Sequence, residues 1–251
     1  MTVFLLAAGF ACPQAAPRGG YLPGSQMPDM IRIIPPPPTL GDSRDVGDRA
    51  IFKATRALEG SPRWRMAQSD NDFAVPGLMK AFSCSAGLTL DPQNAPRLSG
   101  VLTRVLDDTT AAMNPAKDKY QVKRPFMLAE GSVCINPSSL SKSPDYPSGH
   151  TIFGWAVGSI LAEIEPDRAA EIMARARAFG ESRVVCGVHN ASAVEAGRMI
   201  GTAMVAALHG SAVFRADMDA VRTEIAALRA KNPTAGLSCA VEAATLATSP
   251  Y

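Results

Sequence analysis

Apolar residues recur at a helical spacing along most of the chain. In one segment they fall at Leu98, Val101, Leu102 and Val105, which would lie on one face of an α-helix. We find no stretch with the apolar–polar alternation of a half-buried strand, and no internal repeat. The pattern predicts an all-α fold in which residues 45–251 form a single domain with a helical bundle as its core.

The most apolar of the predicted helices covers residues 151–164. It is apolar on nearly all sides, which is typical of the central helix of a bundle. Asp45, Asp167 and Ser192 are the expected N-caps of three further helices, because their side chains can accept hydrogen bonds from free backbone N–H groups. The other predicted helices cover residues 45–58, 63–69, 96–113, 167–180, 192–208 and 214–231, and residues 74–83 form an apolar stretch expected to be buried.

Two long stretches lack a helical pattern. Residues 17–44 are rich in proline and glycine, which predicts an extended strap rather than a helix. The alternative is a disordered leader, but Ile31, Ile33 and Ile34 favour a strap that is pinned to the core. Residues 114–143 read as irregular, and loops of this length within compact domains are usually functional or disordered.

The first residues carry some features of a secretion signal. Val3 to Ala8 form a short apolar core, and Gly9-Phe10-Ala11 resembles a small-x-small cleavage site, although the usual preceding basic residues are missing. We predict a signal peptide or leader over residues 1–16. A ragged apolar N-terminus and a lipoprotein attached through Cys12 are the alternatives.

Composition narrows the class of protein. The 251 residues are 47% apolar, which is enough to build a full core without a structural metal. A net charge of +2, with no dense run of Lys or Arg, does not favour a nucleic-acid partner. No apolar run reaches the roughly 18 residues that a membrane span requires, so no membrane span is predicted.

The five cysteines are Cys12, Cys84, Cys134, Cys186 and Cys239. Removal of a leader would leave four, an even number that suits two disulfides in an oxidising compartment. Four cysteines allow three pairings, of which we favour Cys84–Cys134 with Cys186–Cys239. No pair has the spacing of metal ligands, so a zinc site is not expected.

The strongest candidate for chemistry is the segment Tyr-Pro-Ser-Gly-His at residues 146–150, just before the most apolar helix. Such a segment can offer free backbone N–H groups, a hydroxyl and an imidazole to one anion. By itself it is also an ordinary turn followed by an N-cap. Two further segments favour the functional interpretation: Lys117-x6-Arg124-Pro and Ser-Arg183-x5-His189.

Together the three segments would bring three cations and two imidazoles to one place. Each cation alone would most simply be a solvated surface charge. Lys117, Arg124 and Arg183 could jointly surround a phosphate dianion, to which arginine offers paired donors and lysine a point charge. Ser148 and the N–H of Gly149 would complete the ring of donors. The two imidazoles suit phosphoryl transfer, one as nucleophile and the other as general acid.

These segments resemble the three-part motif of the type 2 phosphatidic acid phosphatase and vanadium haloperoxidase superfamily. Within it, the chain is similar to the bacterial class A non-specific acid phosphatases from about Tyr21 to His209. The resemblance implies the helical bundle of that fold and a metal-independent acid phosphatase. It also implies a periplasmic enzyme that acts on small phosphomonoesters (nucleotides, sugar and aryl phosphates), with possible phosphotransferase activity and a possible homo-oligomer.

The family pattern implies a role for each site residue. His189 would attack phosphorus and form a phosphohistidine, while His150 would protonate the leaving alcohol and then activate water. The residues implied to hold the phosphate oxygens are Lys117, Arg124, Ser148, Gly149 and Arg183.

One position departs from the family pattern. The family has an Asp four residues after the nucleophilic histidine, where it orients the imidazole, and this chain has Ala193. A backbone carbonyl or Glu195 could orient His189 instead, the enzyme could be slow, or the site could only bind phosphate. A vanadate-dependent haloperoxidase is a further alternative, although that class usually has much longer chains. A membrane-embedded lipid phosphatase is disfavoured because the chain lacks predicted spans.

Overall fold

The computed structural model describes residues 19–231 and 239–251, and the regular secondary structure of these residues is entirely helical. The all-α prediction is therefore confirmed. The predicted leader, residues 1–16, lies outside the described residues. The α-helices are α1 (Met30–Ile33), α2 (Ser43–Thr55), α3 (Pro62–Ser69), α4 (Val75–Ala86), α5 (Pro96–Tyr120), α6 (Gly149–Ile164), α7 (Ala169–Val185), α8 (Ala191–Leu208), α9 (Ala212–Lys231) and α10 (Ala240–Leu246).

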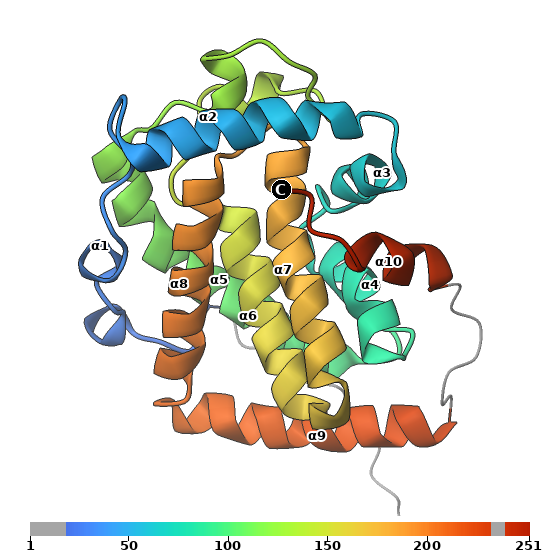
Figure 1. Cartoon of the computed structure of the whole chain (residues 1–251). Coiled ribbons are helices and arrows are strands. Elements are labelled where there is room, and N and C mark those ends of the chain that lie inside the picture. The colour runs from blue at the N-terminus through green and yellow to red at the C-terminus, as the bar shows by residue number, and fades with distance from the viewer. Residues whose placement is uncertain (1–18, 232–238) are drawn as a thin grey trace, which may run out of the picture.

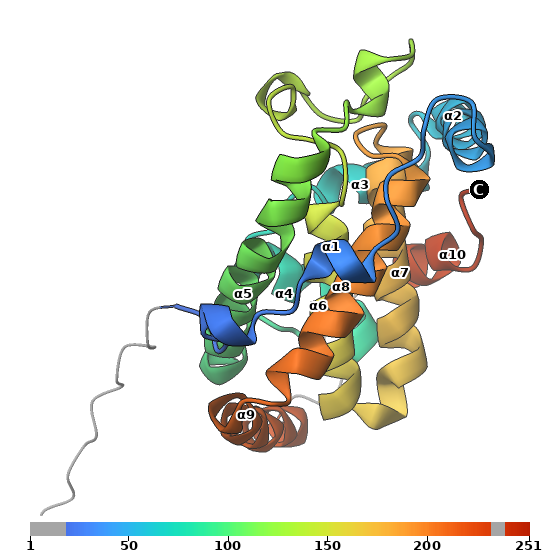
Figure 2. The same cartoon turned by 90° about the vertical axis from the view of Figure 1, so that its left-hand side faces the viewer.

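Helix α6 is the centre of the bundle and packs mainly against α7 and α8 (Figure 1). Helix α2 crosses one end of the bundle and α9 crosses the other. Helices α6 and α8 begin, and α5 and α7 end, at the end covered by α2 (Figures 1 and 2). The bundle thus gathers four helix termini in one place.

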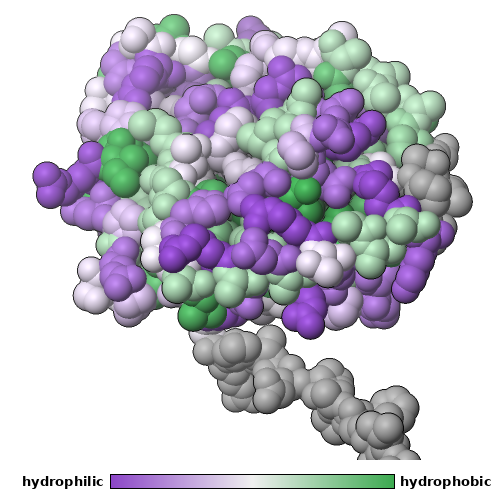
Figure 3. Space-filling view, turned by 90° about the horizontal axis from the view of Figure 1, so that it is seen from below, coloured by the Kyte–Doolittle hydropathy of each residue, from purple (hydrophilic) through white to green (hydrophobic). Residues whose placement is uncertain are grey.

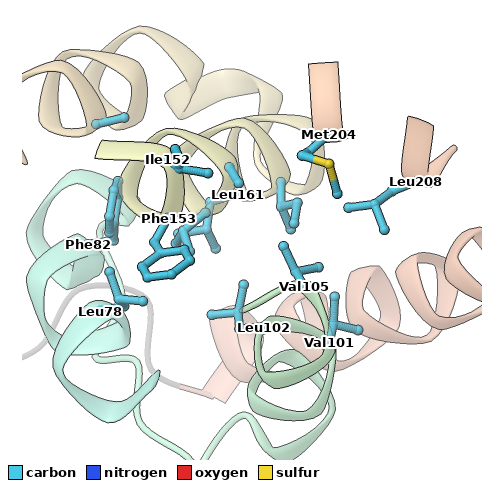
Figure 4. Packing of buried hydrophobic residues seen from close by; sticks show 14 of the residues in the cluster. Leu78, Phe82, Val101, Leu102, Val105, Ile152, Phe153, Leu161, Met204 and Leu208 are labelled. Carbon is cyan, nitrogen blue, oxygen red and sulfur yellow. The ribbon is translucent and has the colours of Figure 1, made fainter. Parts of the chain in front are cut away.

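Small residues let the central helices approach closely. A Cβ atom on Gly158 of α6 would lie 2.5 Å from the Cβ of Ala176 on α7, so a larger residue would force the helices apart. Figure 4 shows the apolar side chains that fill the spaces between the helices. They include Leu78 and Phe82 of α4, Val101, Leu102 and Val105 of α5, Ile152, Phe153 and Leu161 of α6, and Met204 and Leu208 of α8.

The strap before α2 is pinned to the bundle, as its isoleucines indicate. It runs along α5 and α8 (Figure 2) and buries Met30 and Ile34. The backbone N–H of Tyr21 donates to Asp108 of α5 at 2.6 Å. The strap is not wholly extended, because Asp29 caps the single helical turn α1 by accepting from the N–H of Ile31.

Several predicted helix boundaries are wrong, and two of the errors matter for the site. Helix α5 continues through Pro115 to Tyr120, so the start of the predicted irregular stretch is helical. Helix α7 continues past Gly180 to Val185. The apolar pattern fades in both extensions because their buried faces carry polar and charged side chains. Lys117 and Arg183 are therefore fixed on helices.

The predicted N-caps are also wrong. Asp42, rather than Asp45, caps α2 by accepting from two backbone N–H groups at 2.8 and 2.9 Å. Asn190 occupies the N-cap position of α8, and Ser192 instead donates its hydroxyl to Asp48 of α2 at 2.5 Å. Asp167 lies within the short 3-10 helix Pro166–Arg168, so it does not cap α7.

The favoured disulfide pairing is wrong. The bonds join Cys84 to Cys239 and Cys134 to Cys186. Cys134 lies in the loop that follows α5, and its backbone N–H donates to the carbonyl of Cys186 at 3.0 Å. Cys84 lies on α4, and its disulfide joins that helix to Cys239, the residue just before α10. Sequence spacing could not reveal either meeting of distant segments.

Figure 3 shows the end of the molecule on which α9 lies, where polar and apolar side chains are interspersed. Among the described residues, no single helix is both long and apolar enough to span a membrane. Helices α8 and α9 pass the same test together, on length and composition, with a bend of 97° between them. The absence of a span therefore stays a prediction.

Candidate active site

The seven predicted site residues lie at the four helix termini beneath α2. Lys117 is in the last turn of α5, Gly149 is the first residue of α6, and Arg183 is near the end of α7. His189 lies just before α8. The backbone N–H of Ser148 donates to the carbonyl of Ala193 at 3.0 Å, which fixes the start of α6 against α8.

The hydrogen bonds of His189 determine which ring nitrogen carries the proton. Its Nε2 lies 3.0 Å from Nη1 of Arg124, and a guanidinium can only donate. Its Nδ1 lies 2.8 Å from a carboxylate oxygen of Asp145. His189 is therefore neutral, with the proton on Nδ1 and a lone pair on Nε2. Burial, followed by the charge of Arg124, lowers the pKa of His189 well below its usual value and favours this form.

Arg124 and Lys117 are held by backbone carbonyls. Arg124 donates to the carbonyls of Val188 at 2.8 Å and Ser143 at 2.7 Å, and Lys117 donates to that of Pro144 at 2.6 Å. These carbonyls orient the two cations without neutralising them. Burial, with the charge of Arg124, lowers the pKa of Lys117 to about 8.

Arg183 is fully buried but has unused donors. Its Nη1 donates to the side-chain oxygen of Asn71 at 3.0 Å, whereas Nε and Nη2 are buried without a hydrogen-bond partner among residues 19–231 and 239–251. Burial and the nearby Arg124 lower the pKa of Arg183 to about 9, so the charged form of its guanidinium is destabilised in the folded protein. Buried donors are normally satisfied, and two free N–H groups on one guanidinium match two oxygens of a bound phosphate.

The start of α6 supplies further donors. Ser148 is fully buried, and its hydroxyl oxygen accepts from the hydroxyl of Thr151 at 2.9 Å. Its own O–H remains available to donate. As the first residue of α6, Gly149 has a backbone N–H without an intrahelical partner, which can bind an anion. A Cβ atom there would lie 2.9 Å from Sδ of Met113. Only glycine fits at this position without moving a neighbour.

His150, in the first turn of α6, contacts Asn71 and Phe73. Its Nε2 lies 3.1 Å from the carbonyl of Asn71, which can only accept, so Nε2 carries a proton. Nδ1 is thus the nitrogen that remains for a reacting group. Burial and then the charge of Arg183 lower the pKa of His150 well below its usual value. The ring of Phe73, which is 41% exposed, lies 4.4 Å from the His150 ring.

Two site residues were missed in the sequence. Asp145 binds His189, and Asn71 contacts both His150 and Arg183. Asp145 directly precedes the Tyr-Pro-Ser-Gly-His segment, which was a local signal, whereas Asn71 is far from every motif. Glu195 does not orient His189, because its side chain is 61% exposed and pairs with an arginine on its own helix.

Among residues 19–231 and 239–251, no group of three or more His, Cys, Asp or Glu side chains is placed to hold a metal ion. The positive charges that face the site belong to fixed side chains. The arrangement can therefore neutralise a dianion through protein groups alone.

The helix termini of this all-α bundle gather cations and two histidines, an arrangement that can bind a phosphate group. Comparison with known proteins identifies the family. Residues 98–216 match the PAP2 superfamily. The chain is 39% identical over 217 residues to an acid phosphatase of Zymomonas mobilis subsp. mobilis, covering 85% of this chain and 82% of that one. It is 35% identical over 212 residues to a non-specific acid phosphatase of Providencia stuartii, covering 83% and 86%. The chain belongs to the acid phosphatases of the PAP2 superfamily.

The fold agrees with this assignment. The crystal structure of the transmembrane PAP2 type phosphatidylglycerolphosphate phosphatase from Bacillus subtilis superposes with a TM-score of 0.51. The match covers 68% of this chain and 87% of the Bacillus subtilis chain. At 17% identity it shows a common fold alone. The sequence resemblance to acid phosphatases is confirmed.

Lys117→Arg is expected to extend activity to alkaline pH. The pKa of Lys117 is about 8, so its charge is lost as pH rises through that value, whereas an arginine stays charged. The ratio of kcat/KM, variant over wild type, should rise about tenfold between pH 7 and pH 9. Ionisation of the substrate cancels in this ratio. A flat ratio in a folded variant would show that Lys117 stays charged or does not contact phosphate.

Proposed function

We propose that this protein hydrolyses small phosphomonoesters without a metal, through a phosphohistidine on Nε2 of His189. The observation that carries the proposal is the state of His189. Its Nε2 lone pair faces Arg124 inside a cage of cations, so phosphorus would be bound next to a neutral, oriented nucleophile.

The reaction would proceed in two displacements. In the first, the Nε2 lone pair of His189 forms a bond to phosphorus, and the bond from phosphorus to the leaving oxygen breaks. His150 gives its Nδ1 proton to that oxygen, so an alcohol departs. In the second, neutral His150 takes a proton from water, the resulting hydroxide attacks phosphorus, and inorganic phosphate leaves neutral His189 behind.

The proposed mechanism should operate best at acidic pH. His150 has to be protonated in the first step, yet its pKa is lowered by burial and by Arg183. A bound dianion would offset the neighbouring cations and raise that pKa again. Activity should therefore decline as pH rises and His150 loses its proton. The two disulfides support an oxidising compartment such as the periplasm.

The proposal is tested with the wild-type protein and p-nitrophenyl phosphate in excess EDTA. We expect release of p-nitrophenol at undiminished rate, together with a trapped phosphoenzyme that is labile in acid and stable in alkali. An added alcohol acceptor would reveal phosphotransferase activity as a phosphorylated alcohol. Complete loss of turnover in EDTA, or halide oxidation with vanadate and peroxide in place of hydrolysis, would contradict the proposal.

A further inference from the structure

The nucleophilic histidine lacks its carboxylate partner at the family position. Residue 193 is an alanine with no exposed surface, and its carbonyl is already used by the N–H of Ser148. Arg124 donates to Nε2 in this structure but would hold a phosphate oxygen once a substrate binds. Without that contact a neutral imidazole could take either tautomer, and one of the two presents N–H rather than a lone pair to the substrate. Some other group has to fix the ring.

Asp145 meets that requirement from a different segment of the chain. One carboxylate oxygen accepts from Nδ1 of His189 at 2.8 Å, and the other accepts from the side-chain amide of Asn190 at 2.9 Å. The N–H of Asn190 adds a third contact at 3.3 Å. The backbone N–H of Asp145 donates to the carbonyl of Val122 at 2.8 Å, so main chain and side chain are both fixed.

We propose that Asp145 is the positioning residue for His189 and takes the place of a carboxylate at residue 193. The inference rests on the proposed function. Asp145 would hold the proton on Nδ1, so that Nε2 keeps its lone pair. It would also stabilise the positive imidazole that exists while phosphorus is bonded to Nε2 and the proton stays on Nδ1.

The structure also allows a simpler role, in which Asp145 only joins segments. Its contacts with Asn190 link the loop before α6 to the start of α8. Replacing the carboxylate of Asp145 with an amide would distinguish the two roles. Asp145→Asn keeps the shape and can still join the segments, but its NH2 group can face Nδ1 and reverse the tautomer of His189.

Asp145→Asn should therefore lower kcat by about 10³- to 10⁴-fold, the scale seen when the carboxylate behind a catalytic histidine becomes an amide. KM and the inhibition constant of inorganic phosphate should change by less than about threefold, since phosphate is held by other groups. Proton–nitrogen correlation spectra of the histidine rings, recorded with inorganic phosphate bound and assigned with single His→Gln variants, should show the proton of His189 moving from Nδ1 to Nε2.

Relocation of the carboxylate gives a second test. Asp145→Ser should be as slow as the amide variant, and adding Ala193→Asp to it should recover at least about tenfold in kcat. Ala193→Asp alone should bring no gain, because Asp145 already occupies Nδ1. Glu195→Gln, on the exposed side of α8, is the matched control and should behave as wild type.

The outcomes separate this inference from the proposed function. If His189→Ala stays active, the phosphohistidine fails and the inference fails with it. If His189→Ala is inactive but folded Asp145→Asn keeps wild-type kcat, or loses phosphate binding as much as kcat, the function stands and the positioning role is overturned. A folded double variant as slow as Asp145→Ser overturns the equivalence of positions 145 and 193.

Discussion

His189→Ala is expected to lower kcat for p-nitrophenyl phosphate by about 10⁴- to 10⁶-fold, as loss of the nucleophile does in enzymes with covalent intermediates. The cage of cations would remain, so phosphate should still bind with an inhibition constant near that of the wild type. The variant should form no trapped phosphoenzyme. Stopped-flow and steady-state assays with the isolated variant measure all three effects.

His209→Ala is the matched control. His209 follows α8 at the opposite end of that helix, with a side chain 39% exposed and 2.9 Å from Glu163. Its removal should leave kcat unchanged and cost little stability, because exposed ion pairs contribute about 0–1 kcal/mol. If His189→Ala hydrolysed the ester as fast as His209→Ala, the nucleophile would have to be another group.

The cations and histidines could be predicted because each carries its chemistry within a short local pattern. The spacing along the chain matches the three-part motif at Lys117, Arg124, His150, Arg183 and His189. A contact between two distant segments has no such spacing in the sequence. Asp145 was missed because the family pattern places the partner of His189 at position 193, and the next carboxylate along the sequence is Glu195. The partner lies in the preceding motif.

The fold, like the site, could be predicted where the pattern is local and not where distant segments meet. Periodicity located the central helices because their faces are apolar throughout. It failed at the ends of α5 and α7, where buried faces become polar around the site and the helices look like loops. The disulfide pairing depends on which helix ends meet, as Cys134 and Cys186 do beside the site. Sequence spacing contains no information about those meetings.

Arg183→Met is expected to lower kcat/KM by at least about 10³-fold, because the variant loses donors to the phosphate oxygens, and the loss of even one such donor costs about 10²- to 10³-fold. Unlike most core substitutions, it should not lower the Tm. The guanidinium is fully buried, and within the described part of the chain two of its nitrogens have no hydrogen-bond partner and none is paired with a carboxylate. Replacing such a buried charge with an apolar side chain of similar length is often neutral or stabilising.

Phosphate links the two effects in one measurement. At a phosphate concentration of about 100 Kd, the wild type should gain about 2.7 kcal/mol of stability by mass action, whereas Arg183→Met should gain much less. Arg177→Met is the matched control. Arg177 is on the same helix, and its buried Nε also makes no hydrogen bond among the described residues, but its side chain is 42% exposed and Nε lies 3.5 Å from a carboxylate oxygen of Glu181. It should keep both activity and the phosphate-induced rise in Tm. If Arg183→Met lost stability but kept kcat/KM, Arg183 would support the fold rather than bind the substrate. A guanidinium that binds the phosphate should instead destabilise the free protein and stabilise its complex with phosphate.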